Sequence, residues 1–374
     1  MKFLKVIGVL FICAFTSMSL VGVLYAISED IIHRNNSFIR RYPHHPLTKK
    51  NNFDLGYNSY YIAGFTKDSI YLGNHTAPLH MLSFDKDLRD STHIKLDIER
   101  LNKYEFRSVK VLIYEPYFYF VDGSVPIIYK GRIGKWQGEI VMQDQVYFSQ
   151  ITTLGDEEFA FRARSAITNE NELGNIHLDQ DTVLVKLQPE ILQKQIDGIF
   201  DSDGFLLYNM DLQKIIYTYR YRNEFISTDK DLQLDYRGKT IDTISYAQLD
   251  IAEVSSLNQR KIGPRSITVT HQAATSGIYL FLSSDRLGKY ELQKMLSQAR
   301  IIDVYNLNER IYEFSFYLYD FQKEKMREFV VQDDYLYMLA GNHLISHQLK
   351  QDYFNLNNIE DISADIRRKT ENLK

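Results

Sequence analysis

Cysteine is almost absent from this 374-residue sequence: the single one, Cys13, lies in an apolar segment near the N-terminus. The remainder of the chain therefore has no disulfide, no thiolate nucleophile and no cysteine-ligated metal. An exported domain of this size without disulfides has to rely on a large hydrophobic core. That property is more typical of bacterial envelope proteins than of animal secreted proteins.

An excess of basic charge is also lacking, since 44 Lys and Arg stand against 48 Asp and Glu, with a pI near 6.2. The chain thus shows no overall basic field, and nucleic acid is not an expected partner. The motifs G-x-S-x-G, H-E-x-x-H, G-x-G-x-x-G and the phosphate loop are all missing from the sequence. The sequence consequently predicts no cofactor and excludes the enzyme classes that these motifs define.

Aromatic residues, by contrast, are abundant: 27 Tyr and 22 Phe bring the aromatic content to 13%. Tyr and Phe favour strands, where a flat ring packs across a pleated surface. The bias indicates β structure, in one large domain or in two ordinary ones.

The first 27 residues predict a membrane anchor or a signal segment. Lys2 and Lys5 precede an uncharged stretch, Val6–Ile27, which as a helix would extend ~33 Å, enough to cross a bilayer. Glu29 and Asp30 follow, so the positive-inside rule places the N-terminus in the cytoplasm and the rest outside. The only small residue before a possible cleavage point is Ala26, which favours an uncleaved anchor over export after signal cleavage.

Two further segments flank the expected main domain of residues 51–350. Residues 28–50 are polar and basic and predict a linker, close to anionic headgroups. Residues 351–374 carry Ile359, Ile362 and Ile366 at helical spacing and predict a short C-terminal helix.

The main domain repeats a strand–turn–strand rhythm at intervals of about 40 to 50 residues. One sequence signature recurs, S-x-D-K-D-L, at Ser83–Leu88 and at Ser227–Leu232. The final unit, with strands expected at Met326–Val331, Tyr335–Leu339 and His343–Leu349, is one strand short. Because Asn52–Gly56 could supply that strand, the pattern predicts a ring closed by its two ends. The intervening chain consists of units of about four strands, with strands expected for example at Tyr60–Phe65, Val109–Tyr114 and Ser266–Thr270. A short helical insertion is expected at Asp285–Gln298.

This rhythm resembles the β-propeller superfamily, in particular the six-bladed TolB-like and YncE-like group. The resemblance covers residues from about Phe53 to Leu349 and rests on repeat length and ring closure, since no W-D dipeptide or other blade motif is present. It implies an all-β fold of six to seven four-stranded blades and a central funnel where ligands or peptides dock.

Candidate site residues come from two polar clusters. Arg220 and Arg222 share one face of a predicted strand, and with Glu224 they could bind a carboxylate or a phosphate; pairing with nearby acids or tyrosine rings is the alternative. Asp201 and Asp203 precede Gly204 and resemble the beginning of a calcium loop, although the later acidic ligand is missing and a hairpin turn is the alternative.

The leading functional hypothesis is a non-catalytic module in the bacterial cell envelope, anchored in the inner membrane with the propeller in the periplasm. Its expected partners are the membrane, through the N-terminal helix, and an envelope protein, a peptide or a glycan. The alternative is a propeller enzyme, a glycosidase or lyase or a quinone-dependent dehydrogenase, with its site at the funnel mouth.

Overall fold

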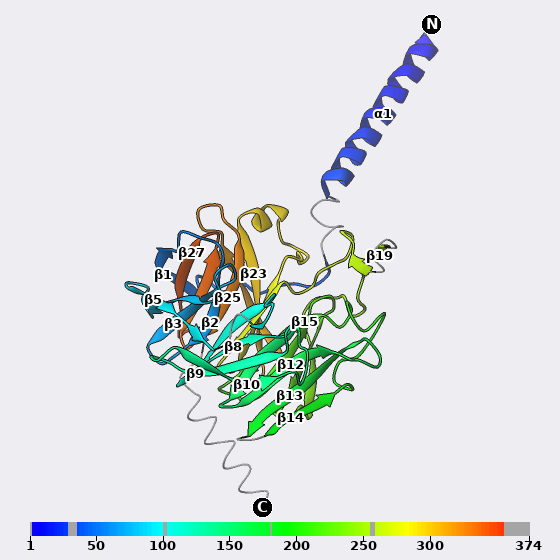
Figure 1. Ribbon diagram of the computed structural model, residues 1–374. Coiled ribbons are helices and arrows are strands. Elements are labelled where there is room, and N and C mark those ends of the chain that lie inside the picture. Colours follow the sequence, from blue (N-terminus) through cyan, green and yellow to red (C-terminus); the bar gives the residue numbers. More distant parts are fainter. Residues whose placement is uncertain (1, 29–35, 100–102, 180–181, 255–258, 355–374) are drawn as a thin grey trace, which may run out of the picture.

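The chain folds into a six-bladed β-propeller preceded by one apolar helix (Figure 1). The computed structural model describes residues 2–28, 36–99, 103–179, 182–254 and 259–354. Each blade is a separate sheet, and successive blades follow one another along the chain. The strands of each sheet pair antiparallel, except for a short parallel pairing at the outer edge of the second blade, between Asp97–Ile98 and Gln137–Gln143. The helix α1 spans Lys2–Ser28.

The blades contain the following strands. Blade 1 consists of β2 (Tyr60–Phe65), β3 (Ser69–Asn74), β4 (His80–Asp85) and β5 (Ser91–Lys95). Blade 2 consists of β6 (Asp97–Ile98), β7 (Val109–Tyr114), β8 (Tyr117–Asp122), β9 (Ile127–Arg132) and β10 (Gln137–Gln143). Blade 3 consists of β11 (Gln150–Gly155), β12 (Glu158–Arg164), β13 (Asn171–Asp179) and β14 (Thr182–Gln188).

The second half of the propeller has the same plan. Blade 4 consists of β15 (Gly204–Asn209), β16 (Lys214–Tyr219), β17 (Glu224–Thr228) and β18 (Leu234–Lys239). A hairpin of β19 (Ile251–Val254) and β20 (Gln259–Ile262) follows it. Blade 5 consists of β21 (Gln272–Ser276), β22 (Tyr279–Ser284), β23 (Ala299–Asn306) and β24 (Ile311–Tyr319), and blade 6 contains β25 (Met326–Gln332), β26 (Tyr335–Ala340) and β27 (His343–Leu349).

Blade 6 is completed by β1 (Leu47–Asp54), which comes from the other end of the domain. It runs antiparallel to β27, from the pair Leu47 and Leu349 to the pair Asp54 and His343. Figure 1 shows the blue β1 beside the red β27. The predicted closure of the ring by an N-terminal strand is therefore confirmed.

The hydrophobic core is divided among the six contacts between neighbouring blades, with one cluster of buried side chains at each contact. The second strand of each blade is buried on both faces, as in β8, where Phe118, Tyr119, Phe120 and Val121 are all buried. Large flat rings fill the wedge between two blades, which explains the aromatic content of the sequence.

The repeated S-x-D-K-D-L signature forms the same turn in blades 1 and 4. In both copies the aspartate accepts a bond from the backbone N–H four residues later, Arg89 to Asp85 at 2.7 Å and Gln233 to Asp229 at 2.8 Å. Leu88 and Leu232 have φ of 56° and 60°, and both side chains are buried. Burial of the leucine offsets the cost of its left-handed backbone, so the aspartates of this signature have a structural role.

Some predicted segments differ from the structure. Ser266–Thr270 is not a strand, because the N–H groups of Val269 and Thr270 bond to the carbonyl of Arg220, outside blade 5. The expected helical insertion at Asp285–Gln298 is a loop with one 3-10 helix, η4 (Gln293–Ser297). The predicted C-terminal helix falls mainly on residues 355–374, which lie outside the described residues.

The six inner strands form a ring around the axis, with β2, β7, β11, β15, β21 and β25 contacting each other in that order and β25 closing on β2. The edge of an inner strand that faces the axis has no strand partner, so its backbone groups need other partners. Side chains of neighbouring blades supply them. Gln150 bonds both the carbonyl of Gly204 and the N–H of Leu206, and Gln272 bonds the carbonyl of Arg327.

Glu328 occupies a similar position on β25, with both carboxylate oxygens 3.4 Å from the N–H of Ile62 on β2. Burial raises the pKa of Glu328 above its ordinary value, although the Ile62 N–H and the charges of Arg327 and Lys110 oppose the shift. Because the folded-state pKa is the higher one, Glu328 stabilises the fold at low pH, and this stability is lost as the pH rises through the folded-state pKa.

The variant Glu328→Gln should therefore be more stable than the wild type at pH 8, by about 1–3 °C in melting temperature, and equally stable near pH 4. A glutamine keeps the shape and the acceptor without the charge. Thermal unfolding of both proteins at the two pH values measures the effect. A difference that does not change with pH would contradict a role for the charge of Glu328.

Candidate functional site

A central cavity of about 610 Å³ opens at one end of the propeller. It lies at the end that carries the turns between the first and second strands of each blade, and we call it the axial mouth. Its wall takes residues from all six inner strands: Ala63 of β2, Leu112 of β7, Thr152 of β11, Leu206 of β15, Ala273 of β21 and Val330 of β25. No single blade builds this site.

The wall of the axial mouth is mixed, with somewhat more apolar than polar surface. Phe65, Tyr114, Tyr208 and Met210 surround it, and Met210 is 60% exposed. Burial raises the pKa of Tyr208, which keeps its hydroxyl neutral at physiological pH. A pocket with apolar and aromatic walls and a few polar groups suits an apolar side chain or a flat ring.

Charged residues at the rim are engaged with other groups of the protein. Lys86 forms an ion pair with Asp333 at 3.1 Å, and Glu115 accepts a bond from the backbone N–H of Lys67 at 3.0 Å. These contacts join neighbouring blades and leave an electrically balanced rim. The mouth is therefore suited to neutral or apolar ligand groups more than to a small ion.

The candidate residues Arg220, Arg222 and Glu224 lie at the opposite end of the propeller. Arg220 and Arg222 fall in the turn between β16 and β17 and not within a strand, because β16 ends at Tyr219. Arg220 donates to Asp203 at 2.8 Å, and its guanidinium lies 4.5 Å from the ring of Phe205. None of the three residues lines the axial mouth.

The side chain of Arg222 has a different set of partners from that of Arg220. Its side chain is 1% exposed, lies 3.4 Å from the ring centre of Tyr219, donates to the carbonyl of Gln193 at 3.0 Å and pairs with Glu224 at 3.5 Å. The two arginines consequently do not converge on one ligand position. Both arginines instead contact an acidic side chain and an aromatic ring of the protein, which was the alternative to a ligand site.

The two candidate metal ligands are also separated. Asp201 accepts bonds from the backbone N–H groups of four residues, 195 to 198, and these bonds hold the pKa of its carboxyl below the ordinary value although burial opposes them. Asp203 binds Arg162 at 2.6 Å and Arg220 at 2.8 Å. Within the described ranges, no group of three or more His, Cys, Asp and Glu side chains could hold a metal ion.

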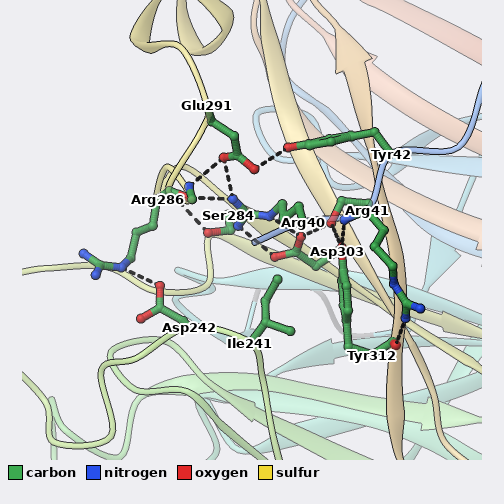
Figure 2. A network of polar contacts seen from close by, with 12 residues as sticks. Arg40, Arg41, Tyr42, Ile241, Asp242, Ser284, Arg286, Glu291, Asp303 and Tyr312 are labelled. Carbon is green, nitrogen blue, oxygen red and sulfur yellow. Dashed lines mark hydrogen bonds and ion pairs between the residues drawn. The ribbon is translucent and has the colours of Figure 1, made fainter. Parts of the chain in front are cut away.

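A buried polar network, not anticipated from the sequence, ties residues that follow α1 to blade 5 (Figure 2). We call residues 36–46 the strap. Arg40 donates to both carboxylate oxygens of Asp303, at 2.6 and 3.0 Å, and to Glu291 at 2.8 Å. Glu291 also accepts from the hydroxyl of Tyr42 at 2.8 Å, and Tyr42 stacks on Tyr317 with ring centres 4.7 Å apart.

In this network the positive charge of Arg40 lies between the negative charges of Asp303 and Glu291. Burial by itself would lower the pKa of Arg40, but Asp303 and Glu291 outweigh burial and raise it above its ordinary value. Backbone bonds continue the attachment at both ends of the strap, from Asn36 N–H to the Leu287 carbonyl and from Lys350 N–H to the Pro46 carbonyl. The part of the expected linker from residue 36 onward is thus a fixed piece of the propeller surface.

A second groove, of about 470 Å³, lies between the strap and blades 5 and 6. Tyr42, His44, Tyr317 and Tyr319 line it together with His347. Burial lowers the pKa of His347 to about 4, so its ring is neutral at physiological pH. Because this groove is built from two blades only, the axial mouth is the better candidate for the principal site.

Comparisons with known proteins supply no family for this chain. No protein-family model matches the chain, and no curated protein matches it. Solved structures with a similar arrangement include a member of the DUF4221 family from Bacteroides vulgatus, with 12% identity, a TM-score of 0.47, and coverage of 85% of this chain and 99% of that one.

Two further similar structures also come from Bacteroides species. A putative exported protein from Bacteroides fragilis has 10% identity and a TM-score of 0.45, with 86% of this chain and 97% of that one covered. A protein of unknown function from Bacteroides thetaiotaomicron has 9% identity and a TM-score of 0.45, with 80% and 72% covered.

Proposed function

We propose that this protein is a membrane-anchored binding module of the bacterial cell envelope, and that its axial mouth receives an apolar segment of a partner protein or peptide. The observation that carries this proposal is the convergence of six inner strands on one cavity, whose wall is more apolar than polar and whose rim is balanced in charge. A protein or peptide ligand fits because apolar side chains can enter the cavity while its backbone meets the polar rim.

The N-terminal helix supports the membrane part of the proposal. Lys5–Ile27 has a mean hydropathy of 2.3, and no part of it is buried in the protein. Its side chains include Phe11, Phe15 and Met18, which are each more than 70% exposed. In water this surface would be unfavourable, so the segment has to be in a membrane or be removed as a signal sequence.

The position of the strap supports the orientation of the site. The strap meets the propeller at the loop between β22 and β23, next to Leu287. That loop belongs to the end opposite the axial mouth, because connections from second to third strands and connections between blades lie at that end. With α1 in the inner membrane, the mouth would face the periplasm and its proteins.

Photocrosslinking in cells tests the site. We expect a photoreactive phenylalanine analogue at Met210, in the mouth, to yield an adduct with a partner protein, and the same analogue at Tyr147 to yield none. The two positions are matched in exposure, at 60% and 67%, and Tyr147 is not part of the mouth. The additional variant Tyr208→Asp should remove the adduct. Equal adducts at both positions, or none at Met210, would overturn the proposed site.

A further inference from the structure

The loop between β22 and β23, residues 285–298, carries exposed apolar and basic side chains at the point where the strap joins the propeller. We propose that this surface docks on the headgroups of an anionic lipid bilayer, so that the propeller lies against the membrane. The surface comprises Ile39 of the strap and Lys289, Tyr290, Leu292 and Lys294 of the loop, and we call it the lipid face. This inference rests on the proposed membrane anchoring.

The composition of the lipid face is that of an interfacial surface. Ile39, Tyr290 and Leu292 are 57%, 70% and 55% exposed, although each could have been a polar residue at no cost to the core. Lys289 and Lys294 are exposed beside them. Aromatic and aliphatic side chains mixed with lysine are the combination that partitions into the boundary between headgroups and acyl chains.

The acidic residues of the same loop do not oppose this attraction. Glu291 is buried against Arg40 and Tyr42, and Asp285 pairs with Arg300 and lies 3.5 Å from His271. Lys289 and Lys294, in contrast, form no ion pair with any residue in the described part of the chain. The loop therefore presents net positive charge outward, which favours anionic headgroups.

The short connection between α1 and the lipid face is the reason for choosing the membrane as the binding partner of this surface. Asn36 bonds the Leu287 carbonyl at 3.1 Å, and Lys289 bonds the Phe38 carbonyl at 2.8 Å. Only residues 29–35 separate Asn36 from the end of α1 at Ser28. Eight residue steps span at most ~29 Å, so a chain anchored through α1 holds the lipid face close to the bilayer.

A small cavity in the lipid face offers space for a headgroup. It measures about 290 Å³. Ile39, Lys289, Tyr290, Leu292 and Met295 line it, together with the ion pair of Arg40 and Glu291 and the rings of Tyr42 and Tyr317. Lys289 would contact a lipid phosphate while the apolar residues contact the first acyl carbons. This geometry favours a lipid over a soluble protein, for which an exposed lysine at the centre of an interface is unusual.

The test uses the full chain in lipid nanodiscs. With Cys13→Ser as the background, a fluorescent label is placed at Gln293→Cys, an exposed position between Leu292 and Lys294 of the lipid face. The control carries the label at Met210→Cys, in the mouth. Nanodiscs contain phosphatidylcholine alone or with phosphatidylglycerol, together with a spin-labelled lipid that quenches fluorescence at the membrane surface. We expect strong quenching at position 293, more with phosphatidylglycerol, and none at position 210.

Charge neutralisation provides the second arm. The variant Lys289→Gln/Lys294→Gln should reduce the ratio of docked to undocked propeller by about 30-fold in phosphatidylglycerol nanodiscs, with an unchanged melting temperature. Equal quenching at positions 293 and 210 in chains that are incorporated into the nanodiscs would overturn the docking alone. Failure of the chain to enter nanodiscs would instead overturn the membrane anchoring, so the two failures are distinguishable.

Discussion

Replacement of Lys50–Tyr57 by a Gly-Ser segment of equal length will leave the propeller unable to close and prone to aggregate. A segment of equal length still spans the distance between the strap and blade 1, but most of β1 is lost. Strand β27 would then expose an unpaired edge, and Leu344 and Ile345, both completely buried in the intact blade, would lose their cover. Phe53 and Leu55 would also leave the cluster between blades 1 and 6.

We expect the loss to equal most of the free energy of unfolding, which is about 5–15 kcal/mol for a typical domain. Size-exclusion chromatography and thermal unfolding of the two proteins measure it. A control replaces residues 165–170, the exposed loop between β12 and β13, by a Gly-Ser segment of the same length as that loop. A monomeric variant with an unchanged melting temperature would show that β1 does not close the ring.

Replacement of Arg40 will have the second largest effect. The variant Arg40→Ala leaves the carboxylates of Asp303 and Glu291 in a buried site without their cation, which should cost about 3–5 kcal/mol of stability. Ser315, which donates to Asp303 at 2.5 Å, cannot replace the lost charge.

Arg41 gives the control, since its side chain is exposed and contacts the surface of blade 5 at Tyr312. The variant Arg41→Ala should cost about 1 kcal/mol or less. A combined variant, Arg40→Met/Asp303→Leu/Glu291→Leu, should recover most of the loss, because no charge then stays buried. Chemical denaturation of the four proteins tests the whole series, and equal stability of the two alanine variants would contradict a buried network.

The fold was predictable because its strands follow a local pattern. The expected strands Tyr60–Phe65 and Val109–Tyr114 coincide with β2 and β7, since alternating aromatic and aliphatic residues end at clear turn signals. The strand Gln137–Gln143 was missed because it is polar at its start and contains Gly138. Its place at the outer edge of blade 2 requires little apolar surface.

The candidate site could not be predicted in the same way. The residues of the axial mouth range from Ala63 to Asp333 in the sequence. Their proximity can be recognised only when the register of all six blades is known.

The attachment of the strap was equally hard to predict from the sequence. Among the basic residues of the segment 28–50, no local pattern distinguishes Arg40, and its partners Glu291 and Asp303 lie more than 250 residues further along the chain.

Alkaline carbonate extraction, followed by determination of the N-terminal sequence, tests the central claim that the propeller is held at a membrane by its own first helix. The motivation is the fully exposed apolar surface of Lys5–Ile27 and the poor cleavage signal at its end. The account predicts an unshortened chain that stays in the membrane pellet after extraction. A soluble chain that begins near Ile27 would contradict it.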